Sequence, residues 1–235
     1  MRRLVRGFWG PRVESVEELA QRWAATLEAV AGLLPQAGAG ESAPWSWQWV
    51  RASGPAAPVT GDPAGLAEAL AAARTADDWS DAVGTGLRLM RTGAPGWTVE
   101  ISGTAGGAPQ FLLQSLVIGV DAPEEAKVPE ADLLAALARI WQPDFGDVSD
   151  NALLDALEDD AGHLVGDPAV GRFGHLSPGR AALLPDGVPP ERELPDGGVL
   201  VAFGDDPAAV VAGYMALRDS GALAPLPRPL DRAAL

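Results

Sequence analysis

The first 35 residues have an apolar pattern typical of a strand followed by a helix. Leu4, Val5, Phe8 and Trp9 are the apolar residues of an expected strand, and a Gly-Pro pair follows them. Ser15 and Glu18 have the spacing of a capping box, in which each side chain satisfies a backbone N–H of the first helical turn. The next apolar residues recur at intervals of three and four, namely Val16, Leu19, Trp23, Leu27, Val30 and Leu34. We therefore expect a helix with one apolar face that ends before Pro35.

A tryptophan-rich insert interrupts the Gly-, Ala-, Ser- and Pro-rich residues 36–61. Within it, residues 45–50 alternate, which is typical of a short strand with Trp45, Trp47 and Trp49 on one face. Three adjacent indoles form either a core layer or a docking patch. We favour the core, because aromatic side chains are mostly buried.

The next 60 residues predict one helix and three strands. An N-cap aspartate followed by proline opens a helix over 62–74. Residues 86–91 and 97–101 alternate between apolar and polar, whereas 111–120 are almost continuously apolar, as in a central strand. Short Gly-rich turns separate these strands and favour antiparallel pairing.

Two acidic helices follow. Pro129 opens the first, which reaches Trp141, and residues 142–148 are predicted to form a loop. Ser149 is the expected cap of the second helix, whose inward positions are Leu153, Leu154 and Leu157.

The last quarter of the chain predicts short strands and one more helix. We expect strands at 172–176, 180–184 and 198–203, and a helix that is capped by an Asp-Pro pair and closed by Gly221. Helices and antiparallel strands therefore mix without βαβ regularity. The predicted fold class is α+β, a mainly antiparallel sheet flanked by helices. We expect a single domain over 1–225 and a Pro-rich tail over 226–235 that is frayed or draped on the surface.

The composition and charge exclude several classes of function. The chain has no cysteine, which removes disulfides, thiolate catalysis and Cys-based metal sites. No apolar run is long enough for a membrane span and no secretory signal is evident, so we expect a cytoplasmic protein. The net charge is −15, and residues 121–167 hold thirteen acids against Lys127 and Arg139. Such a field repels nucleic acid and attracts a basic protein, although a solvated surface gives the same pattern.

Few residues are candidates for catalysis or for metal binding. His163 and His175 come without a nucleophile elbow, so hydrolysis by a catalytic triad is poorly supported. Asp144, Asp147 and Asp150 recur every third residue and could ligate a divalent metal, but they lack the calcium-loop spacing and suit helix capping equally well.

Three segments carry a family resemblance. They are Gly7-Phe8-Trp9-Gly10-Pro11-Arg12 with Glu14-Ser15; Trp141-Gln142-Pro143-Asp144-Phe145-Gly146-Asp147-Val148-Ser149; and Gly198-Val199-Leu200-Val201 leading to Gly221-Ala222-Leu223. In order and separation the chain resembles the immunity protein 52 family of bacterial polymorphic toxin systems. It departs from the family at 171–177, where two expected aromatic residues are replaced.

The resemblance implies an immunity protein that binds a cognate toxin and neutralises it without catalysis. The toxin of this family is usually a nuclease of restriction-endonuclease type, often delivered by a secretion system. We expect contact through an acidic face, with Asp144, Asp147, Asp150, Asp155, Glu158 and Asp159 as electrostatic contacts and Phe145 as an aromatic anchor. No cofactor, catalytic residue, nucleic acid or membrane is expected, and Trp9, Pro11, Arg12 and Trp141 are assigned to the fold.

Two alternatives stay open at the level of sequence. The first is a metal-dependent hydrolase that uses Asp144, Asp147 and Asp150. The second is an effector-loading adaptor that binds a toxin without inhibiting it.

Overall fold

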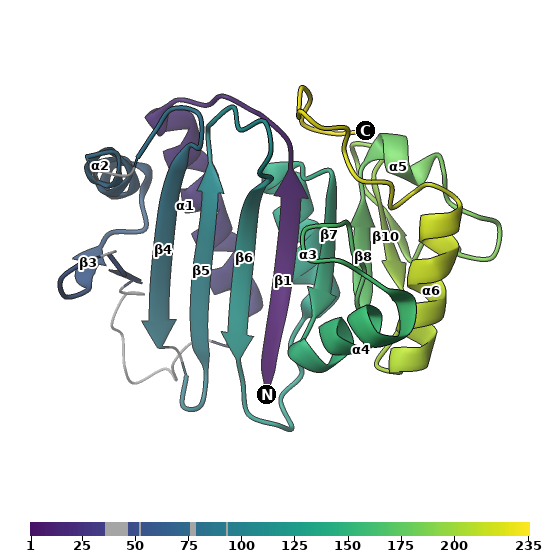
Figure 1. Ribbon diagram of the computed structural model, residues 1–235. Coiled ribbons are helices and arrows are strands. Elements are labelled where there is room, and N and C mark those ends of the chain that lie inside the picture. Colours follow the sequence, from purple (N-terminus) through teal and green to yellow (C-terminus); the bar gives the residue numbers. More distant parts are fainter. Residues whose placement is uncertain (36–46, 52, 76–78, 93) are drawn as a thin grey trace.

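The computed structural model describes residues 1–235 apart from 36–46, 52, 76–78 and 93 (Figure 1). The described residues form one ten-stranded sheet with helices on both faces, which confirms the predicted α+β class. The strands are β1 (Arg2–Trp9), β2 (Trp47–Trp49), β3 (Ala57–Val59), β4 (Thr85–Thr92), β5 (Thr98–Ala105), β6 (Gln114–Asp121), β7 (Phe145–Ser149), β8 (Phe173–Leu176), β9 (Arg192–Glu193) and β10 (Val199–Ala202). The helices are α1 (Val16–Leu33), α2 (Pro63–Ala73), α3 (Glu130–Trp141), α4 (Asn151–Ala161), α5 (Pro178–Ala181) and α6 (Pro207–Asp219).

The first strand lies in the middle of the sheet. The strand order is β3-β2-β4-β5-β6-β1-β7-β8-β10-β9, and every pairing is antiparallel. β1 joins the meander β4-β5-β6 to the later strands, because Arg6 is paired with Val117 of β6 on one side and Asp147 of β7 on the other. Side chains of β1 with even numbers therefore share a face with Asp147.

The two faces of the sheet are covered unequally (Figure 1). α1 and α3 pack on one face, and α2 packs against α1 beside β4. On the opposite face, α4 and α6 lie in front of β7, β8 and β10, where they enclose a second apolar core. The strands β4, β5, β6 and β1 have no helix in front of this opposite face in the described part of the chain.

The larger core is organised around tryptophans. Trp9 of β1 stacks on Trp141 at the end of α3, with 5.4 Å between ring centroids, and Trp23 of α1 meets Trp141 edge-on at 5.7 Å. All three are almost completely buried. Trp47 is also buried and Trp49 packs against this core, as the sequence predicted, whereas Trp45 lies outside the described residues.

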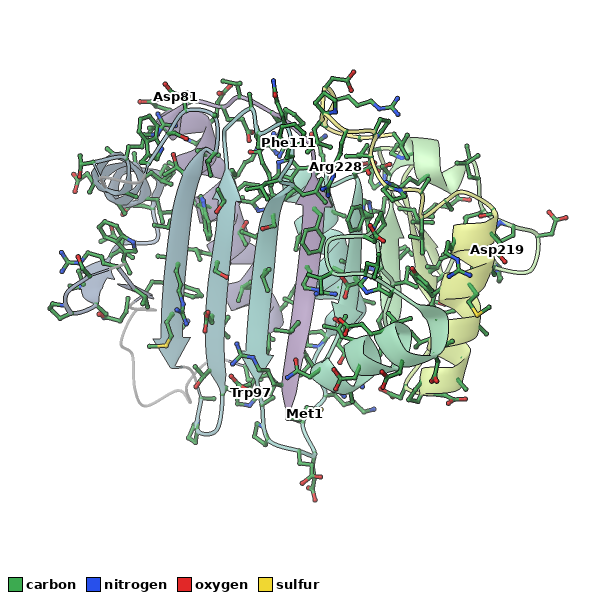
Figure 2. The ribbon with its side chains drawn as sticks, viewed as in Figure 1. Met1, Asp81, Trp97, Phe111, Asp219 and Arg228 are labelled. Carbon is green, nitrogen blue, oxygen red and sulfur yellow. The ribbon has the colours of Figure 1, made fainter. Side chains whose placement is uncertain are left out.

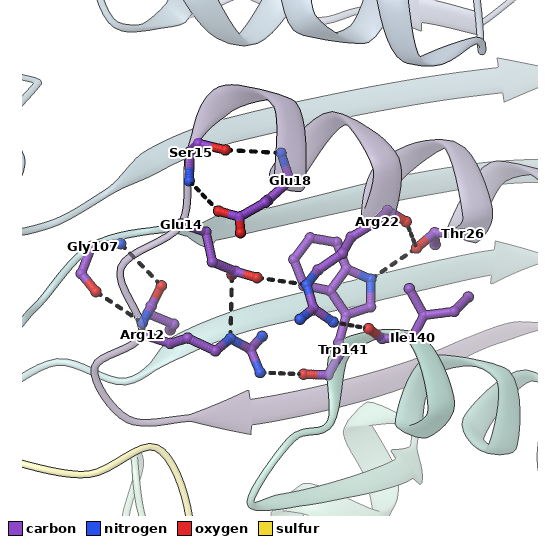
Figure 3. A network of polar contacts seen from close by, with 10 residues as sticks. Arg12, Glu14, Ser15, Glu18, Arg22, Thr26, Gly107, Ile140 and Trp141 are labelled. Atoms are coloured by element: carbon purple, nitrogen blue, oxygen red, sulfur yellow. Dashed lines mark hydrogen bonds and ion pairs between the residues drawn. The ribbon is translucent and has the colours of Figure 1, made fainter.

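A polar network fixes the opening segment to α1 and α3 (Figure 3). The buried Glu14 carboxylate accepts from Arg22 Nε at 2.6 Å and from Arg12 Nε at 3.2 Å. Arg12 also donates a hydrogen bond from Nη1 to the Trp141 carbonyl at 2.8 Å, and the Trp141 indole N–H donates to Thr26 Oγ1 at 2.8 Å. Burial lowers the pKa of Arg12, against the opposing effect of Glu14. The residues of the opening motif therefore act in the fold.

Most predicted elements are present, with the expected caps. Ser15 and Glu18 form a capping box, and Asp62 and Asp206 cap α2 and α6 with Pro at the first helical positions. The C-terminal tail is not frayed: Leu226 and Leu230 are buried, and further backbone contacts hold the tail. These contacts are Leu230 N to the Gln110 carbonyl at 2.7 Å and Gly10 N to the Ala233 carbonyl at 2.9 Å.

Three predictions about local structure are wrong. Residues 145–149 form β7 and not a loop, because both faces of this strand are covered and Arg6 pairs with its Asp147 inside the protein. The second acidic helix is capped by Asp150 and not by Ser149. The predicted strand at 180–184 is replaced by the short helix α5 and a turn.

Glu14→Ala is expected to lower the free energy of unfolding by about 3 kcal/mol, because it leaves two largely buried guanidinium groups without their carboxylate. Glu28→Ala, at an exposed position of the same helix, is the control and should change stability by less than about 0.5 kcal/mol. Chemical denaturation measures both. Equal losses in the two variants would contradict the role given to Glu14.

Candidate functional site

The three regularly spaced aspartates are each neutralised by arginine. Asp144 is completely buried and accepts from Arg180 Nε at 2.8 Å, and Arg180 is also completely buried. Asp144 accepts further hydrogen bonds from the Leu235 backbone N–H at 2.7 Å and from Ser177 Oγ at 3.2 Å. A buried carboxylate requires such partners, so Asp144 belongs to the interior.

Asp147 and Phe145 are also interior residues. Arg6 contacts Asp147 in a bidentate pair, at 3.0 Å from Nε and 2.9 Å from Nη2, and the Asp147 side chain is inaccessible to solvent. Phe145 stacks on Phe8 of β1 with centroids 5.1 Å apart, and the Arg180 guanidinium lies 5.4 Å from the Phe145 ring centroid. Asp144 and Asp147 are therefore not available as electrostatic contacts, because neighbouring elements cover both, and Phe145 is almost completely buried.

Asp150 has a structural role as well. Its carboxylate caps α4 by accepting from the Leu153 backbone N–H at 3.0 Å, and it pairs with Arg3 at 2.9 Å and Arg172 at 2.8 Å. Burial opposes ionisation of Asp150, but these hydrogen bonds and guanidinium groups outweigh that effect and lower its pKa. The side chain keeps a part-exposed edge of 22%.

The carboxylates of this set do not form a metal centre. Asp144, Asp147 and Asp150 each face a different arginine, and within the described residues no group of three His, Cys, Asp or Glu side chains is arranged to hold a metal ion. A hydrolase that uses these three aspartates is therefore not supported by their geometry.

The two histidines differ in their surroundings. His175 is buried in β8, and neither of its ring nitrogens has a hydrogen-bond partner. Burial lowers the pKa of His175 to about 4, against the weaker effects of Asp196 and Asp144. His163 follows α4, where its ring meets Tyr214 edge-on with 5.8 Å between centroids. Within the described residues neither histidine forms a hydrogen bond with a Ser, Thr or Tyr hydroxyl.

α4 carries a group of exposed acids. Asp155, Glu158 and Asp159 are exposed there, as is Asp160. Six of the thirteen acids in 121–167 form ion pairs with arginines from outside that segment, namely Asp121, Glu130, Asp132, Asp144, Asp147 and Asp150. Within the described residues the other seven acids of the segment form no ion pair, and four of these seven lie on α4.

The acids in the last turn of α4 interact unfavourably with the helix dipole. Glu158, Asp159 and Asp160 lie in the last turn, where the exposed carbonyl groups favour a cation. Asp155 and Asp159 are also four residues apart, which puts like charges on neighbouring turns. Arg218 of α6 donates to the Ala161 carbonyl at 2.9 Å and offsets part of this conflict. A helix end that violates local electrostatic preference is typical of a surface kept for function.

A pocket of about 590 Å³ opens beside this helix. Its floor is formed by Arg6 and Phe8 of β1 with Phe145 of β7, and its walls come from α4, the loop after α4, the β5–β6 loop and the C-terminal tail. The wall residues are Phe111, Leu112, Leu113, Leu154, Glu158, His163, Val165, Gly166, Asp167, Ala169 and Arg228. Figure 2 shows Phe111 and Arg228 at the same end of the sheet.

The rim of the pocket exposes large apolar side chains, two of which the sequence predicted to lie in a central strand. Phe111 is 61% exposed and Leu112 is 65% exposed, because β6 starts only at Gln114 and leaves them in the preceding loop. In the loop after α4, Val165 also lines the pocket and is 90% exposed. The continuous apolarity of 111–120 thus predicted a strand correctly but did not reveal this surface.

Comparisons with known proteins show a likeness in fold and no match in sequence. No family model matches the chain, and no curated protein matches it. Among solved structures, the chain is similar to the Pseudomonas aeruginosa T6SS protein PA0821, with a TM-score of 0.49 and 15% identity, over 95% of this chain and 76% of that chain. The resemblance to the immunity protein 52 family stays a prediction.

One further observation concerns membranes. Within the part of the chain that the structure describes, every helix is too short or too polar to cross a bilayer.

The burial of His175 predicts that the free energy of unfolding depends on pH. Its pKa is lowered from 6.5 to about 4 in the folded state, so the unfolded chain takes up a proton first as the pH falls. Stability should therefore decrease between pH 6.5 and 4, by at most about 1.4 kcal/mol per pH unit from this group. His175→Leu should give a flatter profile in urea titrations across this window. Parallel profiles of the two proteins would contradict the prediction.

Proposed function

We propose that this protein is an immunity protein, a non-catalytic inhibitor that binds a cognate toxin domain and protects the cell that makes both. The observation that carries the proposal is the row of exposed, unpaired carboxylates on α4 beside an open apolar pocket. The sequence resemblance supports a toxin of the nuclease type, whose surface for nucleic acid is basic. Carboxylates on α4 suit the positions that phosphates would occupy on such a surface.

The energetics of α4 support binding over a purely structural role. The acids in its last turn do not stabilise the helix, and they form no ion pair in the described part of the chain. They do provide a localised field that accelerates the encounter with a basic partner, an effect that weakens with salt. Part-exposed Asp150 lies at the N-terminal end of the same helix, but its arginines already neutralise it.

The test uses the toxin domain encoded beside this protein, in a growth-protection assay and in binding kinetics. Asp155→Asn, Glu158→Gln and Asp159→Asn, combined in one variant, should lower the association rate constant by roughly tenfold or more at low ionic strength. The same variant should unfold at an equal or higher temperature than the wild type, because it removes charges that oppose the helix dipole.

The matched control removes three exposed acids from the helices on the other side of the molecule. Glu17→Gln, Glu28→Gln and Glu68→Gln produce the same change in net charge and should leave association nearly unchanged. Equal slowing in the two triple variants would remove α4 from the interface. Binding without protection would indicate the adaptor, and no binding by the wild type would overturn the proposal.

A further inference from the structure

The pocket beside α4 has a floor that folding has already made rigid. The bidentate Arg6–Asp147 pair and the Phe8–Phe145 stack hold the floor in place, and Arg180 lies against the Phe145 ring. A partner that enters the pocket therefore does not have to order its floor, which reduces the entropic cost of binding. At about 590 Å³ the pocket is within the range of sites that enclose a small ligand or a large side chain.

The rim indicates that the occupant is part of a macromolecule. Phe111 and Leu112 of the β5–β6 loop and Val165 of the loop after α4 line the pocket and are each more than half exposed. A small molecule inside the pocket would leave most of this rim in water, whereas a protein surface would cover it. Exposed apolar residues gathered around one opening are typical of a protein contact.

The charges around the pocket indicate which kind of protein surface would bind there. Arg6 is neutralised by Asp147, so it offers little net charge to an occupant. Glu158 lines the α4 wall, Asp155 and Asp159 lie next to it on the helix, and no ion pair within the described residues neutralises these three acids. A Lys or Arg beside the inserted side chain would meet this wall. Arg228 lies in the wall formed by the tail.

The same charges oppose other occupants. A second copy of this chain carries the same net charge of −15 and the same acidic helix, so self-association would bring like charges together. An anionic membrane surface or a nucleic acid is repelled for the same reason.

We infer that this pocket receives an aromatic or large aliphatic side chain of the toxin that is flanked by Lys or Arg, with the apolar group on Phe8 and the basic group against Glu158. The inference rests on the proposed function. It divides the interface into an apolar anchor, which controls dissociation, and the α4 acids, which control association.

The first test uses the same toxin domain and variants at exposed rim positions, which should fold normally. Phe111→Ser with Val165→Ser should raise the dissociation rate constant by about tenfold or more and change the association rate constant by less than about threefold. The control is Val13→Ser with Leu183→Ser, two exposed apolar positions that do not line the pocket. Wild-type binding with equal dissociation rates in the two variants would overturn the inference and leave the proposed function standing.

The second test does not need the toxin. An acetylated and amidated tripeptide, arginine–tryptophan–arginine, is titrated to millimolar concentration into the isotope-labelled protein. It should shift the methyl resonances of Leu112, Leu154 and Val165, whereas peptides with glutamate for arginine, or alanine for tryptophan, should not. The absence of these shifts, shifts confined to other residues, or binding to anionic vesicles that the rim variant loses would each overturn the inference.

Discussion

An ionised carboxylate is costly to remove from water unless a cation and hydrogen-bond donors accompany it, and the second half of the sheet depends on this constraint. β7 carries Asp147 in its middle and Asp144 just before it, and both are completely buried. Arg6 reaches Asp147 from β1, and Arg180 reaches Asp144 from α5. The pairs join segments far apart in the sequence, so strand pairing and charge pairing select the same register. Removing either partner would leave a charge that the interior cannot solvate.

The tryptophan core and the network around Glu14 provide the same kind of connection on the other side of β1. Trp9, Trp23 and Trp141 bring β1, α1 and α3 together through ring contacts, and Arg12 and Arg22 add hydrogen bonds to the last residues of α3. The segments that carry the family resemblance are therefore mostly interior. They explain how the chain folds, whereas the proposed recognition surface consists of α4 and two loops that the resemblance does not include.

Much of the fold was predictable because it depends on local signals. The capping box at Ser15, the Asp-Pro starts of α2 and α6, and the alternation of β4 and β5 each need only neighbouring residues to be interpreted. β7 was missed because Asp147 is stable in a strand only when Arg6 is beside it, a contact between residues 141 apart in sequence. For the same reason the charge of residues 121–167 predicted a broad acidic face, although arginines from elsewhere in the chain neutralise part of it. Of the predicted contacts, Asp155, Glu158 and Asp159 are exposed, and the pocket had no local signal at all.

The Phe8–Phe145 stack has one more consequence, for how such a protein can change its choice of partner. Its rings form the base of the pocket and also rest on the interior of the sheet, so a substitution there disturbs folding together with recognition. No such coupling of folding and recognition applies to the rim residues of the β5–β6 loop, to the exposed residues of α4 or to the loop after α4. Under the proposed function, substitutions in those three places would change the choice of partner while the scaffold beneath them stays constant.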